Sequence, residues 1–272
     1  MATKIINNKK FIRFNAKPKL TNGSLEALKW LALLSMLVDH FNALVLYQFN
    51  KYSFTWYQIG RLAAPLFVLI LAYNLARPAQ QLSNTASRLP RIRRVIGLTF
   101  VCGLLSVPVI LWAFPYERWL PNIMFNFSCG ALAIYLLTAA EEQINKNNKP
   151  AISYWYYYLA AVLVILLLGG WPECSYPATI TLILAYIFFR QQQKQPVKQF
   201  NFNLLVIGLM LILALASWYR INLTHNAMLA LPFFIAAYHI EINLPKRTPK
   251  IFFYAFYPLH FIVLAGVARV VA

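Results

Sequence analysis

Long apolar runs separated by short polar segments occupy most of the 272-residue chain. A helix needs about 20 consecutive, mostly apolar residues to cross the roughly 30 Å hydrocarbon core of a bilayer. Comparison of the runs with that length predicts nine membrane-spanning helices. The expected spans are residues 27–48, 57–76, 95–114, 121–139, 152–170, 174–190, 203–220, 225–240 and 251–269. Because several boundaries are soft, eight or ten spans also fit the pattern.

Composition supports a membrane protein. Hydrophobic residues make up 60% of the chain and charged residues only 12%, too few polar side chains to cover a soluble protein of this size. We therefore predict an all-α fold, a polytopic integral membrane helical bundle formed by a single domain from residue 27 to residue 272. Residues 1–26 are rich in Asn and Lys and are expected to form a basic, disordered tail on the cytoplasmic side.

The distribution of positive charge predicts the orientation. Cytoplasmic loops of membrane proteins carry an excess of Lys and Arg. With the N-terminus in the cytoplasm, all but five of the 25 Lys and Arg residues fall on the inner side, and the exceptions are Lys51, Arg61, Arg118, Arg220 and Arg269. The net charge of +18 is then explained by topology and by attraction to anionic lipid, so no nucleic-acid partner is expected.

Sequence motifs of several enzyme classes are missing. The three cysteines are an odd number and lack the spacing of metal ligands, so neither a disulfide framework nor a metal site is predicted. The chain has no glycine-rich phosphate loop and no G-x-S-x-G nucleophile elbow. These absences argue against the soluble enzyme families that depend on such motifs.

One acidic residue stands inside the first apolar run. Asp39 is the only aspartate in the chain, and it is followed directly by His40. An aspartate near the middle of a membrane helix costs about 2.5 to 3.5 kcal/mol on insertion scales, so it is usually kept where it faces a protein interior or does chemistry. The second apolar run contains Arg61, which is a candidate partner for this carboxylate.

Helical spacing groups the polar residues of the first span. Ser35, Asp39 and Asn42 are four and then three residues apart, which places them on one face of a helix. His40 points about 100° away from Asp39, because each helical residue turns by that angle. We therefore expect His40 to contact a different span.

Two later spans carry further polar groups. Asn122 and Asn126 are four residues apart and share a face of the fourth span. Tyr257 and His260 flank Pro258, which removes a backbone hydrogen bond and frees a carbonyl near Tyr254. Counting at about 1.5 Å per residue puts all of these groups in the central and outer layers of the membrane. This placement is consistent with one cavity that opens outward.

Four blocks of residues carry a resemblance to a known family. They are Leu28–His40, Gly60-Arg61 with Pro65-Leu66-Phe67, Asn122–Phe125, and Phe256-Tyr257 with His260. In order and spacing these blocks resemble the TraX family of membrane acetyltransferases over most of the membrane portion.

The resemblance implies transfer of acetyl from acetyl-CoA to the N-terminal α-amine of a conjugative pilin subunit, after signal cleavage has freed that amine. It also implies a location in the inner membrane of a bacterium. An α-amino group has a pKa of about 8, so it must lose a proton before it attacks a thioester. His40 or His260, with a reference pKa of about 6.5, is a suitable general base.

The other polar groups have expected roles in that reaction. Asp39 would orient a histidine or bind the incoming ammonium, and Arg61 would hold Asp39 ionised or stabilise the developing oxyanion. A purely structural ion pair is the alternative for these two residues, and helix–helix hydrogen bonding is the alternative for the asparagines. The side chains expected to bind substrate are Ser35, Asn122, Asn126 and Tyr257.

The donor poses a problem of access. Acetyl-CoA is cytosolic, whereas the processed pilin N-terminus is expected on the outer side. We therefore expect the basic cluster of Arg88, Arg91, Arg93 and Arg94 to hold the CoA head group while the pantetheine arm reaches toward Asp39. A positive-inside signal alone is the other explanation of this cluster.

Two other functions remain compatible with the residues. A membrane O-acetyltransferase acting on a glycan or a lipid would use similar groups, and only the acceptor would distinguish it. An ion-coupled transporter would more naturally show inverted repeats, broken helices and several intramembrane charges. A single acid and an odd number of predicted spans argue against transport.

Overall fold

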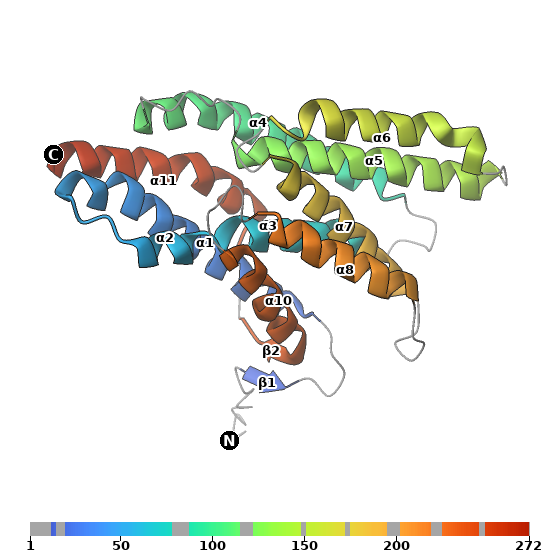
Figure 1. Ribbon diagram of the computed structural model, residues 1–272, viewed down its shortest axis with the longest axis horizontal. Helices are drawn as coiled ribbons and strands as arrows, with labels where there is room; N and C mark the ends of the chain where they lie inside the picture. The colour runs from blue at the N-terminus through green and yellow to red at the C-terminus, as the bar shows by residue number, and fades with distance from the viewer. Residues whose placement is uncertain are drawn as a thin grey trace, which may run out of the picture.

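The computed structural model describes residues 12–14, 20–77, 87–114, 122–147, 151–171, 175–194, 202–218, 225–244 and 248–271, which form a bundle of helices and one small sheet (Figure 1). The α-helices are α1 (Asn22–Leu44), α2 (Phe54–Gly60), α3 (Ala63–Ala76), α4 (Leu89–Ala113), α5 (Ile123–Asn147), α6 (Trp155–Leu168), α7 (Ser175–Lys194), α8 (Phe202–Ala216), α10 (Ala230–His239) and α11 (Lys250–Val271). Short 3₁₀ helices are η1 (Leu46–Phe49), η2 (Ala151–Tyr154) and η3 (His225–Leu229). The strands are β1 (Ile12–Phe14) and β2 (Ile240–Ile242).

Among the described residues, each predicted span is mostly helical. In the described part of the chain, five helical segments are long and apolar enough to cross a membrane. They are Asn22–Phe49, Phe54–Ala76, Leu89–Ala113, Ile123–Asn147 and Ile251–Val271. Three shorter apolar helices accompany them, at Trp155–Leu168, Leu205–Ala216 and Asn226–His239. An all-α membrane fold is thus confirmed, while the count of nine spans and the cytoplasmic N-terminus stay predictions.

The second predicted span is broken about one turn from its start. Helix α2 ends at Gly60 and α3 begins at Ala63, with Arg61 and Leu62 in the turn between them. Pro65 has no N–H to donate to the carbonyl four residues earlier, which is that of Arg61. The break therefore falls where proline interrupts the helical ladder, and it places Arg61 at a helix end inside the bundle.

Small residues allow the helices to pack closely. Ala32, Ala72 and Ala131 are fully buried, each on a different helix. At Gly130 a Cβ atom would lie 2.5 Å from the end of the Leu182 side chain of α7, so a larger residue would displace that leucine at the crossing of α5 and α7. Close approach of backbones through small residues is typical of helix packing in membranes.

Proline in the last helix has the effect expected from the sequence. Pro258 lies inside α11 and cannot donate to the carbonyl of Tyr254. The Sγ atom of Cys102 on α4 donates to that carbonyl at 3.2 Å. The predicted free carbonyl is confirmed, and a thiol from a neighbouring helix occupies it.

The start of the first helix is tied to a short antiparallel sheet that the sequence did not predict. Arg13 of β1 pairs with Glu241 of β2. Helix α1 begins after Thr21, whose Oγ1 accepts from the N–H of Ser24 at 3.1 Å. The hydroxyl of Ser24 in turn donates to the carbonyl of Ile240 at 2.6 Å. Residues 1–11 and 15–19 of the predicted tail lie outside the described part.

Candidate active site

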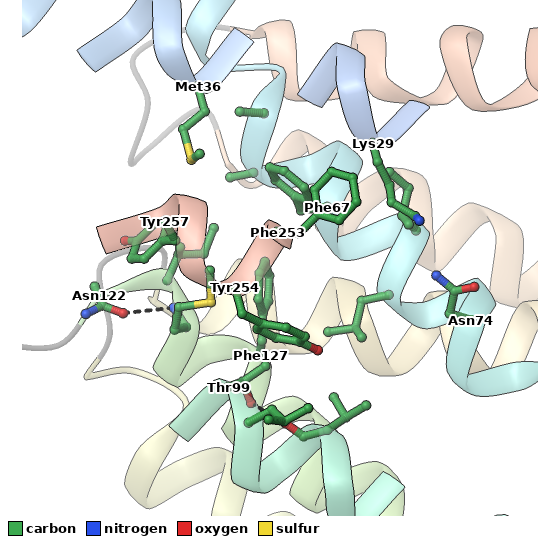
Figure 2. Close-up of a pocket in the computed structure, with 18 of the residues that line it drawn as sticks. Lys29, Met36, Phe67, Asn74, Thr99, Asn122, Phe127, Phe253, Tyr254 and Tyr257 are labelled. Atoms are coloured by element: carbon green, nitrogen blue, oxygen red, sulfur yellow. Dashed lines mark hydrogen bonds between the residues drawn. The ribbon is translucent and has the colours of Figure 1, made fainter. Parts of the chain in front are cut away.

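A cavity of about 1130 Å³ lies among α1, α3, α4, α5 and α11. In Figure 2, Lys29 and Asn74 lie on one side of it and Asn122 and Tyr257 on the other. Aromatic rings lie between these polar groups, contributed by Phe67, Phe253 and Tyr254. The cavity is therefore polar at its two ends and largely apolar between them.

The cavity follows most of the length of α1. Its lining includes residues of α1 from Asn22 to Ala43, which a rise of about 1.5 Å per residue places about 30 Å apart. We call the part lined by Asp39, His40 and Arg61 the Asp39 end, and the part lined by Lys29, Arg77, Arg91 and Arg94 the basic end. The cavity thus joins two groups of charged side chains that are far apart along the helix.

At the Asp39 end, the predicted pair of opposite charges is present. An Nη atom of Arg61 donates to the carboxylate of Asp39. The guanidinium also lies over the ring of Tyr57, with 4.5 Å between the guanidinium carbon and the ring centroid. Its Nε atom is buried and has no hydrogen-bond partner among the described residues. Arg61 therefore neutralises Asp39 and keeps one donor free.

Gly60 lets the broken helix approach α1 at this point. A Cβ atom on Gly60 would lie 2.2 Å from the Cβ of Asp39 and 2.7 Å from its Oδ1. No side chain fits in that space, so the backbone of the break rests directly against Asp39. This contact brings the neighbouring Arg61 within reach of the carboxylate.

His40 contacts α11, as its helical position predicts. Its Nδ1 atom lies 2.7 Å from Nε2 of His260. The Nδ1 atom of His260 lies 3.0 Å from the carbonyl oxygen of Phe256, one turn earlier on the same helix. His40 lines the cavity and His260 does not, because His260 is buried behind it with 4% of its surface exposed. Of the two candidate bases, only His40 reaches the cavity.

The remaining predicted substrate ligands separate into two groups. Tyr257 and Asn122 line the cavity. Asn122 is also bonded within the protein. Its Oδ1 accepts from the N–H of Met124 at 3.0 Å (Figure 2). Its Nδ2 donates to the carbonyl of Gly103 at 3.0 Å. Asn122 therefore caps the start of α5 and links it to α4.

The structure places Asn126 and Ser35 away from the cavity, unlike the expected arrangement. Asn126 faces α7, where its Nδ2 donates to the carbonyl of Ser175 at 3.0 Å and to Thr179 Oγ1 at 3.3 Å. Ser35 is buried beside the lining residue Met36 but does not line the cavity itself. Successive residues of a helix turn by about 100°, so the polar stripe of α1 and its lining face only partly overlap.

The basic end contains four cations of α1, α3 and α4. Lys29 forms an ion pair with Glu26 at 2.7 Å, and Arg77 donates to Asn22 Oδ1 at 3.0 Å. Arg91 donates to the carbonyl of Arg77 at 3.3 Å. For Arg94 the described residues offer neither a hydrogen bond nor an ion pair. With one acid for four cations, this end has a surplus of positive charge.

Of the four arginines in the predicted CoA-binding cluster, two lie elsewhere. Arg91 and Arg94 line the cavity, whereas Arg88 and Arg93 do not. The backbone N–H of Arg88 donates to Glu142 of α5, and Arg93 is exposed on the outside of α4. The helical period explains the division, because residues 91 and 94 share a face and residue 93 points away from it.

Comparison with protein families gives one match. A family model described as TraX protein matches residues 24–268, which include every helix that lines the cavity. The chain belongs to the TraX family. Searches among curated proteins and among solved structures find no match.

Two cavity residues of this TraX protein were missed by sequence reasoning. Lys29 and Arg77 were counted only among the positive charges of the inner side, yet both line the cavity. Lys29 had a usable signal, since Glu26, Lys29, Met36 and His40 fall on one stripe of α1 and all line the cavity. The sequence around Arg77 contains no comparable pattern, because Arg77 reaches the cavity only through the packing of α3 against α1.

Metal binding has no support in the described part of this TraX chain. There, no three His, Cys, Asp or Glu side chains gather closely enough to hold a metal ion. Cys102 and Cys129 are free thiols, and each donates to a backbone carbonyl. The site chemistry is therefore built from one acid, one arginine, two histidines and the cations of the basic end.

Proposed function

We propose that this TraX protein is an acyltransferase of the bacterial inner membrane that moves acetyl from acetyl-CoA to the N-terminal α-amine of a processed conjugative pilin. The observation that carries the proposal is the single cavity that connects a cationic end with a buried Asp39–Arg61 pair and His40. An acetyl donor with an anionic head and a reactive thioester at the end of a long arm matches both ends. Family membership and the sequence blocks that led to it support the same reaction.

The donor would bind along the length of the cavity. The CoA head group carries several phosphate charges, and the cations of the basic end attract them. Arg94 is the strongest candidate for a phosphate contact, because it lines the cavity and has no partner among the described residues. The pantetheine arm would pass the rings of Phe67 and Phe253 and bring the thioester to the Asp39 end.

The transfer itself needs one base and no covalent intermediate. The acceptor ammonium, whose pKa is about 8, first releases one proton to water and then attacks as the neutral amine. In the proposed step, the amine nitrogen forms a bond to the thioester carbonyl carbon while His40 takes the proton that the nitrogen loses. The carbon–sulfur bond then breaks, and the proton passes from His40 to the CoA thiolate. The products are the acetylated amine and free CoA.

Arg61 would stabilise the negative charge that develops on the thioester oxygen. Arg61 lines the cavity, and Asp39 fixes its guanidinium in place through an Nη atom, so this guanidinium is the candidate donor for that oxygen. Preorganised donors of this kind act strongly where water is excluded. Asp39 in this arrangement orients Arg61 and does not itself accept the proton of the amine.

The arrangement also accounts for access from both sides of the membrane. With the orientation predicted from the charges, the basic end lies toward the cytosol and the Asp39 end lies farther toward the outer side. Donor and acceptor would then approach the same thioester from opposite directions. Neither substrate has to cross the membrane completely.

The proposal is tested by the intact mass of processed pilin from cells that contain the chain, lack it, or carry His40→Ala at matched abundance. We expect an acetyl-sized mass increase with the intact chain and none in the other two cells. His239→Gln serves as a matched control, because His239 is exposed at the end of α10 and does not line the cavity.

A purified assay separates the donor from the acceptor. The protein in detergent is mixed with acetyl-CoA and a synthetic peptide that starts with the mature pilin N-terminus, and CoA thiol release is measured. Thiol release with the peptide supports pilin acetylation. Absence of any acetyl-sized increase in cells that hold well-folded chain and cognate pilin contradicts the pilin acceptor, and a glycan or lipid acceptor then becomes the next one to test.

A further inference from the structure

The contact between His40 and His260 fixes more than the position of two rings. Their nitrogen atoms are 2.7 Å apart, while the ring centroids are 4.9 Å apart and the ring planes differ by 18°. Rings that were stacked face to face at this centroid distance would not bring two nitrogens so close. The two imidazoles therefore meet edge to edge in nearly one plane, as partners in an N–H···N hydrogen bond.

The direction of that hydrogen bond follows from the next contact. A backbone carbonyl can only accept, so the Nδ1 atom of His260, 3.0 Å from the carbonyl of Phe256, must carry a proton. A neutral imidazole has one proton, so Nε2 of His260 is then unprotonated and accepts. The donor to it must be Nδ1 of His40. The only nitrogen left with a lone pair is Nε2 of His40.

We infer that His260 is a positioning residue, which holds His40 in the tautomer whose Nε2 lone pair is open to the cavity. The chain of donors runs from His40 Nδ1 to His260 Nε2 and from His260 Nδ1 to the Phe256 carbonyl. Which nitrogen of a histidine carries the proton is set by the hydrogen bond that the other nitrogen makes. The catalytic consequence, that His40 Nε2 is the atom that takes the amine proton, rests on the function proposed above.

Alternative proton arrangements fit the surroundings less well. If His260 Nε2 instead donated to His40 Nδ1, then Nδ1 of a neutral His260 would be unprotonated. Its lone pair would face the lone pairs of the Phe256 carbonyl oxygen and be repelled by them. A doubly protonated His260 would carry a positive charge in a side chain that is only 4% exposed. Asp39, the only aspartate, could not compensate that charge, because it is already paired with Arg61. Neighbouring rings also restrain both histidines, because the ring centroid of Phe261 lies 4.4 Å from that of His40 and 4.2 Å from that of His260.

The tautomer can be observed directly, without any assay of activity. The protein is labelled with ¹⁵N-histidine, purified in detergent and measured by NMR. We expect one pair of histidines with scalar coupling across an N–H···N bond, from a protonated Nδ1 to an unprotonated Nε2. The Nε2 atom of the donor ring, His40, should also be unprotonated. A free histidine side chain in water prefers the opposite tautomer, with its proton on Nε2.

Variants of His260 test the positioning role. His260→Leu removes the acceptor, so His40 should shift its proton to Nε2 and the acetyl-transfer rate should fall by about tenfold or more. His260→Gln can place an amide oxygen where Nε2 was, and it should keep both the His40 tautomer and most of the rate. His239→Gln, remote from the cavity, should change neither.

Each result has a definite meaning. A proton on His40 Nε2 in the unmodified protein overturns the inference whatever the protein acetylates, and the same holds if His260→Leu leaves the tautomer unchanged. The expected tautomer with no acetyl transfer to pilin supports the inference and contradicts only the proposed function. Because the unmodified protein gives the first answer, a variant that fails to fold does not prevent the test.

Discussion

The two ends of the cavity hold their charges differently. At the Asp39 end, carboxylate and guanidinium are bonded to each other, and each histidine has a hydrogen-bond partner. At the basic end, four cations share one acid, and Arg94 has neither a hydrogen bond nor an ion pair among the described residues. A network of mutually bonded groups is suited to holding geometry, whereas unpaired cations are suited to binding an anion that arrives from outside. The comparison predicts that changes at the two ends alter different kinetic constants.

The largest effect is expected from Asp39→Asn. Loss of the carboxylate charge leaves Arg61 without its counter-ion and free to move, so the rate of acetyl transfer should fall by about 100-fold or more. The affinity for acetyl-CoA should change little, because its head group binds at the other end. Turnover and acetyl-CoA binding are measured on the same purified sample.

A double variant sharpens this prediction. Leaving one member of a buried ion pair uncompensated costs about 3 to 5 kcal/mol, and that cost is relieved when both charges are removed. We therefore expect Asp39→Asn with Arg61→Met to recover thermal stability but not activity. If the double variant recovers activity as well, the pair is structural and not part of the reaction.

The next largest effect is expected from Gly60→Ala. The added methyl group would lie 2.2 Å from Asp39 Cβ, so α1 and the break between α2 and α3 must separate. Overpacking of this kind costs about 1 to 3 kcal/mol of stability, and the displaced Arg61 should lower the turnover by about tenfold. Gly97→Ala is the matched control, since a Cβ there meets nothing within 4 Å. Unchanged turnover in Gly60→Ala would contradict a role for this close contact.

A different kind of effect, on KM and not on turnover, is expected at the basic end. Arg91→Gln with Arg94→Gln should raise the KM for acetyl-CoA by about tenfold, because charge-assisted hydrogen bonds to phosphate are lost, and leave kcat nearly unchanged. Arg93→Gln removes one positive charge from the same helix without touching the cavity, so the KM of this variant should stay the same. If Arg93→Gln raised the KM for acetyl-CoA as much as the double variant does, the arginines would not bind the donor through the cavity, and the cluster would serve only to orient the protein in the membrane.

The smallest effect on chemistry is expected from Asn126→Ala. This side chain links α5 to Ser175 and Thr179, outside the cavity. Its loss should lower stability by about 1 kcal/mol, as for other hydrogen bonds between membrane helices. Activity per folded molecule, measured after correction for the folded fraction, should remain. A selective loss of activity would return Asn126 to the substrate-binding residues.

The sequence predicted a residue's position best where that position depends on the geometry of one helix. The direction of His40 away from Asp39 follows from the turn per residue alone, and its contact with another helix is confirmed. The free carbonyl of Tyr254 follows from Pro258 in the same way. Both predictions needed only the geometry of a single element.

Residues whose role depends on two helices were harder to place. Asn126 and Asn122 look alike in the sequence, yet one faces α7 and the other lines the cavity. Arg77 joins the basic end only because α3 packs against α1 there. The strand pair β1 and β2 joins residues about 230 positions apart in a region with no periodic pattern, so no local rule could predict it.

The sequence separation of the polar contacts also orders the assembly of the protein during its synthesis. Asp39 and Arg61 are 22 residues apart, so the two charges can neutralise each other as soon as the first helical hairpin has entered the membrane. His40 and His260 are 220 residues apart, and β2 is likewise made late in the chain. The Nδ1 atom of His40 therefore gains its partner only when α11 has been inserted. A chain that stops before α11 has Asp39 and Arg61 already paired, but its His40 lacks the partner that orients it.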